Sequence, residues 1–426
     1  MDFKEHLKKY LNDSQIEELV SSFDNKEHKG FYLSANKMSK DTLLKLYPNV
    51  KKHPIVENGF LYDQDEYKLG KSIYHELGAF YIQDPSAMLV SHYLNPQKHQ
   101  KILDLCAAPG GKSVMASLLM KDTGLLLSND LSKSRANVLL QNVERMGLGN
   151  VVVSSFDFSK IKDEFFESFD GIILDAPCSG SGMFRKQAEM KQDWTYEKVL
   201  KNAAFQKELI LMAFDMLKEG GTLMYSTCSY SYEEDEEVID YLLSKRAAKL
   251  EYIEDFDGYF RSPKYKETIH LFPNKFVGEG HYIAKIIKSG KLAISNDEKI
   301  TISRVTNSKG NSRQISTYLM NKKLPKIVTD YALRPGLELS TKIADKEVPS
   351  HHYSHYQSGI NSIELNKEEA IKFIKGESLT KNNLLEGYRF VSYLGMNIGV
   401  AHVIGTTLKN LYPKGLRKSL KIDESF

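Results

Sequence analysis

The fold follows from the stretch Ile172-Ile173-Leu174-Asp175-Ala176-Pro177-Cys178-Ser179-Gly180-Ser181-Gly182, read together with a later stretch, Tyr225-Ser226-Thr227-Cys228-Ser229. In each case an apolar run, typical of a buried parallel strand, ends in a small polar loop that carries a cysteine. Ligands bind at the carboxyl ends of the strands in an open α/β sheet. We therefore expect Asp175, Cys178 and Cys228 to converge on one pocket, which we interpret as the active site.

Strands and helices alternate strictly from Lys101 onward, which predicts an α/β fold. Strands are expected over 102–105, 125–130, 151–153 and 222–225, and helices between them, the last of which should end at Gly220-Gly221. After Cys228, Ser231 and Glu234 form a capping-box pattern, which would place the acidic run 233–237 in the first turn of a helix.

Composition limits the function classes. The 426 residues are 41% hydrophobic and 27% charged, as in ordinary globular proteins, and the net charge of +3 gives no argument for a nucleic-acid partner by itself. No signal peptide or membrane-spanning apolar run is visible, so we expect a cytoplasmic protein. Three cysteines are too few for a disulfide framework or a zinc site, and His351-His352-Tyr353-Ser354-His355 is predicted to be a polar surface turn. No metal is expected.

The loop after the first strand ends in Gly110-Gly111-Lys112-Ser113, which is similar to a phosphate-binding loop. That motif requires glycine where this chain has Cys106, which disfavours a nucleotide triphosphatase. An acid about 20 residues beyond a glycine-rich turn can hold ribose hydroxyls, and Asp130, Asp157 and Asp175 all end strands. Without a G-x-G-x-x-G motif, the pattern favours S-adenosylmethionine over a dinucleotide.

Two cysteines beside an adenosine site indicate methylation of cytosine at C5. This carbon is a poor nucleophile until a thiolate adds to C6, and Asp175 is placed to engage N3 and offset the developing charge. A second thiol could assist product release, and these arguments do not decide between Cys178 and Cys228 as the nucleophile. Zinc-dependent deamination is excluded because no second cysteine follows Pro177-Cys178 at the required spacing and no H-x-E motif is present.

The two ends of the chain form separate units in this interpretation. Residues 1–75 are predicted to form an accessory region. Residues 291–316 are predicted to be a polar linker, which is followed by a C-terminal unit over 317–426. The last 46 residues hold seven Lys or Arg against three acids, interleaved with tyrosines, which suits a small β-rich RNA-binding module. A solvated basic face is an equally good explanation of that composition.

Three motifs resemble the signatures of the Nop/Sun family of RNA 5-methylcytosine methyltransferases: Leu105 to Lys112, Asp175 to Gly182, and Ser226 to Ser229. Gln83-Asp84-Pro85-Ser86 and Gly278-Glu279-Gly280 are similar to segments that flank the family's core. Leu411-Tyr412-Pro413-Lys414-Gly415-Leu416-Arg417 resembles the bacterial branch that methylates small-subunit ribosomal RNA. The resemblance implies a Rossmann-like class I methyltransferase core over 76–290, a helical and RRM-like N-terminal region and a C-terminal PUA-like module.

The resemblance also implies roles for individual residues. Cys228 would be the nucleophile, Cys178 would promote product release, and Asp175 would contact N3 of the base. The S-adenosylmethionine site would comprise Cys106, Ala107, Ala108, Pro109, Gly110, Gly111, Lys112, Asp130, Arg135, Asp157 and Asp175.

The leading hypothesis is therefore an S-adenosylmethionine-dependent enzyme that forms 5-methylcytosine in small-subunit (16S) ribosomal RNA through a Cys–C6 adduct. The alternatives are a non-catalytic RNA-binding ribosome assembly factor with the same fold, and the same chemistry on transfer RNA. We expect a monomer without a membrane partner.

Overall fold

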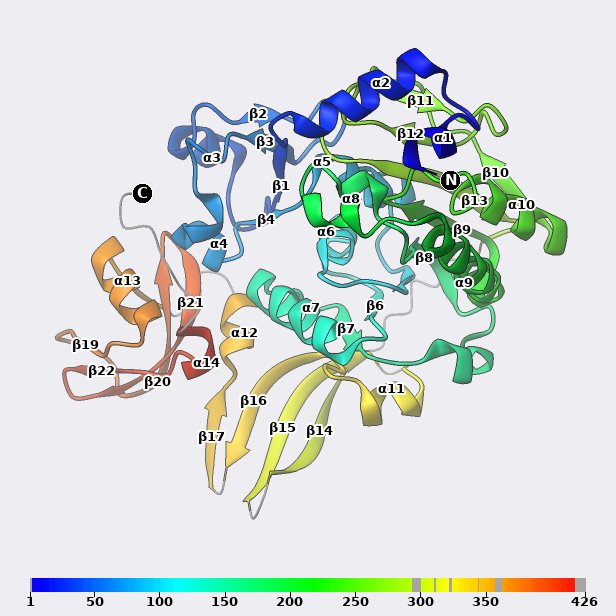
Figure 1. Cartoon of the computed structure of the whole chain (residues 1–426). Helices are drawn as coiled ribbons and strands as arrows, with labels where there is room; N and C mark the ends of the chain where they lie inside the picture. The colour runs from blue at the N-terminus through cyan, green and yellow to red at the C-terminus, as the bar shows by residue number, and fades with distance from the viewer. Residues whose placement is uncertain are drawn as a thin grey trace.

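The computed structural model describes residues 2–292, 300–309, 312–321, 324–343, 345–356 and 362–417. The chain is built around one large sheet with the strand order β11-β12-β13-β9-β8-β5-β6-β7, in which β10 also pairs with β13 (Figure 1). Its strands are β5 (Lys101–Asp104), β6 (Leu125–Asn129), β7 (Val151–Ser154), β8 (Phe169–Asp175), β9 (Leu217–Thr227), β10 (Ala248–Glu251), β11 (Tyr259–Arg261), β12 (Ile269–Leu271) and β13 (His281–Lys288). Strands β5 to β9 run parallel, whereas β13 is antiparallel to β9.

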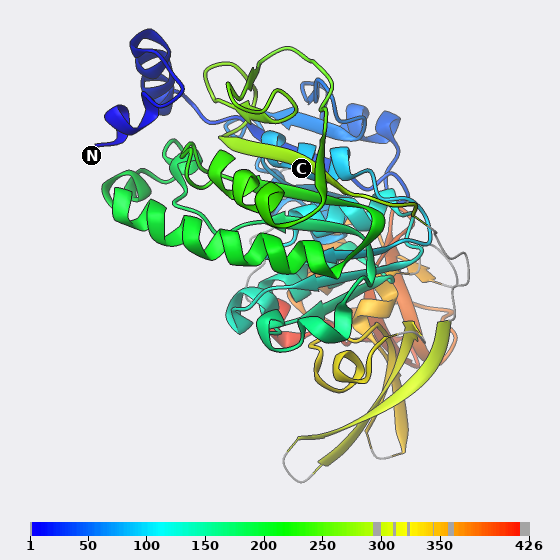
Figure 2. The same cartoon turned by 90° about the vertical axis from the view of Figure 1, so that its right-hand side faces the viewer.

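Helices cover both faces of this sheet, because successive strand residues point to opposite sides. Ile102 and Ile173 pack in one apolar cluster with helices α5, α6 and α7, while Leu103 and Ile172 pack in another with α9 and α10. The core helices are α5 (Pro85–Leu94), α6 (Gly111–Leu119), α7 (Lys133–Met146), α8 (Ala188–Gln192), α9 (Tyr196–Met216) and α10 (Glu236–Lys245). Figure 2 shows the long helix α9 along the outside of the sheet. The α/β prediction is confirmed.

The order of the strands reverses at β5. From β5 the chain proceeds outward through β6 and β7, and then returns to the other side of β5 as β8 and β9. The loops after β5 and β8 therefore diverge and leave space between them at the carboxyl edge of the sheet, where ligands of open α/β sheets bind.

The N-terminal region contributes a four-stranded antiparallel sheet, β2-β3-β1-β4, and two helices that pack on the core. Its elements are α1 (Phe3–Leu7), α2 (Asp13–Ser21), β1 (Lys29–Leu33), α3 (Lys40–Leu46), β2 (Lys51–Lys52), β3 (Gly59–Tyr62), α4 (Ile73–Glu76) and β4 (Phe80–Ile82). A boundary after residue 75 would separate β4 from the sheet in which it pairs with β1. A boundary after β4 keeps the sheet whole.

The C-terminal region contains two sheets, β14-β15-β16-β17 and β18-β20-β21-β22-β19, the first of which extends away from the core (Figure 1). The elements are β14 (Ile300–Lys309), β15 (Ser312–Asn321), α11 (Lys326–Tyr331), β16 (Leu337–Ile343), β17 (Lys346–Pro349), α12 (His351–Tyr356), β18 (Ser362–Glu364), α13 (Lys367–Lys375), β19 (Leu379–Thr380), β20 (Gly387–Tyr393), β21 (Met396–Ile404), β22 (Thr407–Asn410) and α14 (Lys414–Arg417). One apolar cluster joins the second sheet to the N-terminal sheet.

Three local predictions are wrong. Residues 300–309 and 312–316 of the predicted linker form strands, while 293–299, 310 and 311 lie outside the described residues. Helix α9 ends at Met216, and Gly220-Gly221 lie inside β9. The histidine-rich segment is helix α12 rather than a surface turn, and the His355 side chain is buried.

No helix among the described residues is long and apolar enough to cross a membrane.

Candidate active site

The two cysteine loops meet at the carboxyl ends of β8 and β9. These strands pair in parallel, and the Ala176 amide donates to the Ser226 carbonyl at 2.8 Å, so the loops that follow run side by side. The Sγ atoms of Cys178 and Cys228 are 3.0 Å apart, and both cysteines are free and half-buried. The predicted convergence of the two thiols is therefore present in the structure.

A glycine permits the close approach of these loops. The Gly182 amide donates to the Cys228 carbonyl at 2.8 Å, and the Gly280 amide donates to the Gly182 carbonyl at 3.0 Å. A Cβ atom on Gly182 would lie 2.7 Å from the Gly280 carbonyl oxygen and 2.8 Å from that of Cys228. No side chain fits at residue 182 without moving the backbone beside Cys228.

Asp175 lies next to the thiols in a network of charged and polar groups. Lys112 Nζ donates to Oδ2 and Ser226 Oγ to Oδ1, each at 2.7 Å. Burial alone would raise the pKa of Asp175, but the Lys112 charge, helped by these hydrogen bonds, holds it below its usual value. Asp175 is therefore an ionised acceptor in the free protein, and Lys112 is the proton donor beside it.

His281 borders the same network. Its Nε2 lies 4.0 Å from Asp175 Oδ1, and its Nδ1 is 3.0 Å from Ser86 Oγ. Burial, together with the Lys112 charge, lowers the pKa of His281 to about 4, so the imidazole is neutral at pH 7. Asp84 accepts from the Ser86 and Glu279 amides and so ties the Gln83–Ser86 segment to the turn that precedes His281.

A cavity of about 460 Å³ opens beside the cysteine loops, at the ends of β5, β6 and β7. This volume is in the range of small-molecule sites. Its lining comprises Leu105, Cys106, Asn129, Asp130, Leu131, Ser132, Arg135, Phe156, Asp157, Phe158, Ser159, Pro177, Phe205, Glu208, Leu209 and Met212. It combines apolar walls with acids from two strand ends.

The predicted site residues divide between this cavity and its surroundings. Cys106, Asp130, Arg135 and Asp157 line the cavity, whereas residues 107–112 form the adjoining loop and the start of α6. Several side chains hold that loop: Arg135 donates to the Ala108 carbonyl at 2.8 Å, and Asn142 and Tyr81 donate to the Pro109 carbonyl at 2.9 and 3.3 Å. Asp175 lies by the cysteines instead.

Two carboxylate oxygens near the cavity fit a ligand that carries hydroxyl or ammonium donors. Asp130 Oδ2 is buried and accepts no hydrogen bond from the described residues, although Arg135 Nη2 lies 3.3 Å away. Asp104 Oδ1 is likewise without a donor within the described part of the chain. Buried oxygens left open in this way are usually completed by a partner, so the cavity suits the ribose and amino groups of S-adenosylmethionine.

The thiols of Cys178 and Cys106 both have raised pKa values. The hydrogen bond with Cys228, burial, and the Glu234 and Asp175 carboxylates together raise the pKa of Cys178 well above its ordinary value. Burial, reinforced by Asp104 and Asp130, raises the pKa of the Cys106 thiol as well. Both groups therefore stay protonated in the free protein.

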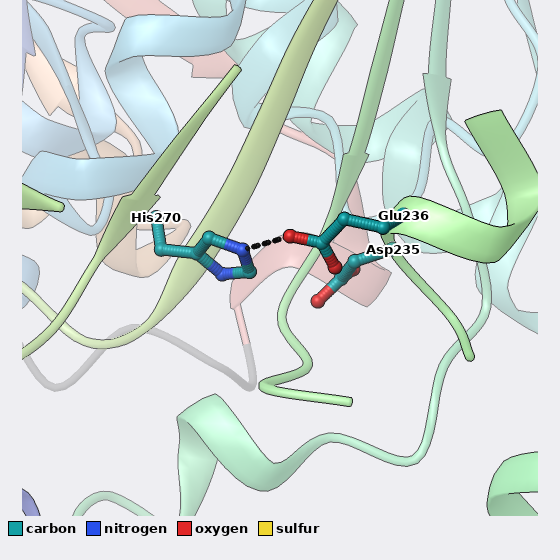
Figure 3. A group of neighbouring side chains, drawn as sticks. All are labelled: Asp235, Glu236 and His270. Carbon is teal, nitrogen blue, oxygen red and sulfur yellow. Dashed lines mark hydrogen bonds and ion pairs between the residues drawn. The ribbon is translucent and has the colours of Figure 1, made fainter. Parts of the chain in front are cut away.

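The acidic run 233–237 does not form the predicted capping box. Helix α10 begins at Glu236, and the Glu234 side chain instead accepts hydrogen bonds from Ser179 and Ser229. Asp235 and Glu236 point toward His270 (Figure 3), and His270 Nε2 lies 2.8 Å from Glu236 Oε1. Candidate metal-ligand atoms of these three buried side chains lie within 4.8 Å of one another. Asp235 accepts from Thr227 Oγ1 at 2.6 Å, while Asp235 Oδ2, Glu236 Oε2 and His270 Nδ1 have no hydrogen-bond partner among the described residues.

Sequence reasoning missed several polar residues at the site: Asp104, Ser226, Glu234 and His281. Asp104 and Ser226 stand at the ends of β5 and β9, where a strand-end rule places functional groups. His281 directly follows the Gly278-Glu279-Gly280 turn, which offered a signal. Glu234 offered none, because its motif also reads as a helix cap.

Family models match three parts of the chain. The 16S rRNA methyltransferase RsmB/F model matches residues 91–287, the N-terminal domain of 16S rRNA methyltransferase RsmF matches 1–85, and the methyltransferase RsmF PUA domain matches 360–418. The expected methyltransferase core with an N-terminal domain and a C-terminal PUA domain is confirmed.

Known proteins agree with these matches. The chain is 31% identical to ribosomal RNA small subunit methyltransferase F of Vibrio parahaemolyticus over 94% of both chains, and 32% identical to that of Shewanella piezotolerans over 86% of this chain and 85% of the other. A methyltransferase homolog protein from Pyrococcus horikoshii is similar in structure, with a TM-score of 0.60 and 26% identity over 67% of this chain and 93% of that one. NSun6 from the same organism shares the fold, with a TM-score of 0.62 and 21% identity over 68% of this chain and 98% of that one. The chain therefore belongs to the ribosomal RNA small subunit methyltransferase F family of S-adenosylmethionine-dependent 16S rRNA methyltransferases.

Proposed function

We propose that this protein methylates C5 of a cytosine in 16S ribosomal RNA through a transient covalent bond between Cys228 Sγ and C6 of the base. The observation that carries the proposal is the pair of thiols 3.0 Å apart, beside the Lys112–Asp175 ion pair and next to the cavity that Asp130 lines. We expect the reaction to take place in the cytoplasm, and the protein to act as a monomer without a metal.

Residues of the cavity would hold the cofactor, which supplies the methyl group. Asp130 Oδ2 is open to accept from ribose hydroxyls, and the acid at the end of a second strand commonly has this role in dinucleotide sites of related topology. Asp157 and the neighbouring Phe156 and Phe158 would border the adenine, and Arg135 would lie at the periphery. The loop 106–112 would face the methionine part.

The ion pair of Lys112 with Asp175 would prepare the base. Cys228 gives its thiol proton to water and attacks as the thiolate. When it adds to C6, electron density moves toward N3, which must gain a proton or a hydrogen bond. Asp175 is ionised and cannot donate to N3 by itself, but Lys112 Nζ can pass a proton to it over 2.7 Å. C5 then attacks the methyl group: the C5–CH3 bond forms as the bond from that carbon to the cofactor sulfur breaks, and S-adenosylhomocysteine is the leaving group.

Release requires a base, here a water molecule, to take the proton from C5. The electrons of the C5–H bond then form the C5=C6 double bond as the bond from C6 to Cys228 breaks. Cys228 sulfur leaves with the bonding electrons, and a proton donor nearby speeds this step. Cys178 lies within hydrogen-bonding distance of Cys228, and its raised pKa keeps it in the protonated form that such a donor needs. A protonated thiol suits Cys178 to the release step, and the resemblance to the Nop/Sun family assigns the attack on C6 to Cys228.

The test is nucleoside mass spectrometry of RNA after incubation with the protein and S-adenosylmethionine. Unmodified small subunits, naked 16S RNA and transfer RNA would be compared. New 5-methylcytosine in 16S RNA that disappears with Cys228→Ala supports the proposal; its appearance in transfer RNA alone would move the substrate but keep the chemistry. Activity on none of the three would favour an assembly factor that works by binding.

Covalent trapping assigns the two thiols. Cys178→Ala is expected to accumulate a protein–RNA adduct that survives denaturing electrophoresis, and Cys228→Ala to form none. An adduct that persists in Cys228→Ala would contradict the assignment of the nucleophile.

A further inference from the structure

Glu234 is fully buried where β9 passes into α10, and its carboxylate accepts four hydrogen bonds. Oε1 accepts from the Ser179 amide at 2.8 Å and from Gln206 Nε2 at 3.2 Å. Oε2 accepts from the hydroxyls of Ser179 and Ser229, each at 2.5 Å. Burial raises the pKa of Glu234, but the hydrogen bonds from Ser179, Ser229 and Gln206 oppose this shift. All four partners donate to the carboxylate, which matches its ionised form.

These partners are the residues that flank the cysteines. Ser179 directly follows Cys178, and Ser229 directly follows Cys228. The two hydroxyls share Oε2 and lie 3.2 Å from each other. Gln206 also donates to the carbonyl of Pro177 at 2.8 Å, so the residue before Cys178 is held by the same cluster.

We infer that Glu234 is a positioning residue that fixes the separation of Cys178 from Cys228 and so permits the covalent intermediate to be released. The inference rests on the two-cysteine mechanism proposed above. Glu234 contacts neither RNA base nor sulfur in this role; it acts through Ser179 and Ser229. One carboxylate that spans both loops sets their relative position more tightly than separate contacts to each loop would.

The neighbouring acids hold the turn in place. Asp235 accepts from Thr227 Oγ1 at 2.6 Å, and this threonine precedes Cys228. Thr227 Oγ1 in turn accepts from the Ser229 amide at 3.1 Å. Glu236 is fixed on the other side by His270 (Figure 3). The main chain of Glu234 is secured as well, because Tyr225 donates to its carbonyl at 2.6 Å.

The release step should be the step most sensitive to this arrangement. While Cys228 is bonded to C6, only a second thiol at a defined distance can deliver a proton to it, and a displacement of about 1 Å can cost roughly 100-fold in rate. The negative charge of Glu234 also contributes to the raised pKa of Cys178. Loss of this charge should shift the pH dependence of release toward lower pH.

The decisive variant is Glu234→Gln, which has nearly the same shape but replaces one carboxylate oxygen by an NH2 group. That group cannot accept a hydrogen bond from any of the four donors, and the negative charge is lost. We expect the RNA adduct still to form and then to break down about 10- to 100-fold more slowly, so that it accumulates as in Cys178→Ala. Adduct formation, adduct breakdown and their pH profiles would be measured separately on 16S RNA with the full-length protein.

Glu233→Gln is the matched control. This adjacent acid is equally buried, but it accepts hydrogen bonds from Tyr196 and Lys9 and touches neither cysteine loop. Adduct breakdown in this control should match the wild-type rate. Equal slowing in both variants would overturn the inference, because it would indicate general destabilisation, which thermal unfolding of each variant would reveal.

A milder variant keeps the inference testable if Glu234→Gln does not fold. Ser229→Ala removes one of the four donors and should slow breakdown about 3- to 10-fold, with the melting temperature and cofactor affinity close to wild type. If a folded Glu234→Gln variant or the Ser229→Ala variant breaks down the RNA adduct at the wild-type rate, the inference is overturned while the proposed mechanism stands. Absence of any adduct in Cys178→Ala as well would overturn the proposed mechanism, and the inference with it.

Discussion

The cysteine loops and the neighbouring cavity differ in how their acidic groups are satisfied. Around the cysteines, Glu234 accepts four hydrogen bonds and Asp175 accepts two, all from the protein itself. In the cavity, Asp130 Oδ2 accepts none from the described residues, and the Asp157 side chain is 39% exposed. One region is complete before any ligand arrives, whereas the other is left open.

This difference separates two tasks of a group-transfer enzyme. Groups that must stabilise developing charge act best when their geometry is set in advance, because no reorganisation is then needed during the reaction. Groups that must bind and release a cofactor at each turnover have to exchange partners. Changes near the cysteines should therefore alter the chemical step, and changes in the cavity should alter cofactor affinity.

The largest effect is expected for Lys112→Met, which removes the ion pair with Asp175. Without the lysine charge, burial raises the pKa of Asp175 instead of being outweighed, and the charged donor beside it is lost. The single-turnover methylation rate should fall about 100- to 1,000-fold, because the positive charge that offsets the charge developing on the base is lost. Cofactor affinity, measured by calorimetry, should change by less than about 3-fold, because the Lys112 ammonium is hydrogen-bonded to Asp175 and Lys112 is not among the residues that line the cavity.

Lys207→Met is the control for this change. Lys207 pairs with Glu237 away from the thiols, and its loss should leave the methylation rate unaltered. If Lys112→Met instead weakened cofactor binding as strongly as the rate, the distinction between the two regions would break down.

A smaller effect concerns Asp104, which lies between the two regions and is fully buried. Burial raises the pKa of Asp104 to about 7, although the hydrogen bond from Ser113 opposes this. The folded protein then binds a proton that the unfolded chain releases near pH 4, so the contribution of Asp104 to stability falls as the pH rises from about 4 to about 7.

Asp104→Asn should remove this dependence. The free energy of unfolding would be measured in urea at pH 5 and at pH 8. Its fall from pH 5 to pH 8 should be smaller in the variant than in the wild type by an amount on the order of 3 kcal/mol. Asp163→Asn, a change at an exposed acid, serves as control and should keep the wild-type slope. Parallel slopes for wild type and Asp104→Asn would show that Asp104 is ionised in the folded protein.

The sequence predicts the core well because its strands are buried on both faces. Such strands read as short apolar runs, and the polar residue that ends each run marks the ligand-binding edge of the sheet. Cys178, Cys228 and Asp175 were placed together on this basis, and Asp130 and Asp157 at the next strand ends.

Elsewhere local patterns were ambiguous. Ser231 and Glu234 match a capping box, but in the structure the Glu234 carboxylate instead accepts hydrogen bonds from Ser179 and Ser229. These two serines lie in loops that are 50 residues apart in sequence. Only tertiary structure distinguishes these uses. In β14, Ile300 and Ile302 alternate with polar residues, a strand signal that the surrounding Ser, Asn and Lys content outweighed.

The next effect is expected in the open cavity. Asp130→Asn replaces the acceptor proposed for the ribose hydroxyls, and a hydrogen bond to a charged group is worth about 1.5–3 kcal/mol. The dissociation constant for S-adenosylmethionine should therefore rise about 10- to 100-fold, while the single-turnover rate at saturating cofactor stays within about 3-fold of wild type. A loss of rate at saturation would contradict the assignment of this region to binding.

The smallest effect is expected for Asp157→Asn, and it sharpens the comparison within the cavity itself. Unlike Asp130, Asp157 already accepts from the amide and hydroxyl of Ser159, and Lys160 lies 3.3 Å away. These contacts lower the pKa of Asp157, and they leave a ligand little to complete. Cofactor affinity should weaken less than about 3-fold, because exposed and already paired charges contribute little. If Asp157→Asn weakened cofactor affinity as much as Asp130→Asn, the cofactor would have to displace Ser159 from Asp157. Exchange of hydrogen-bond partners, rather than an oxygen without a partner, would then explain how the cavity binds its ligand.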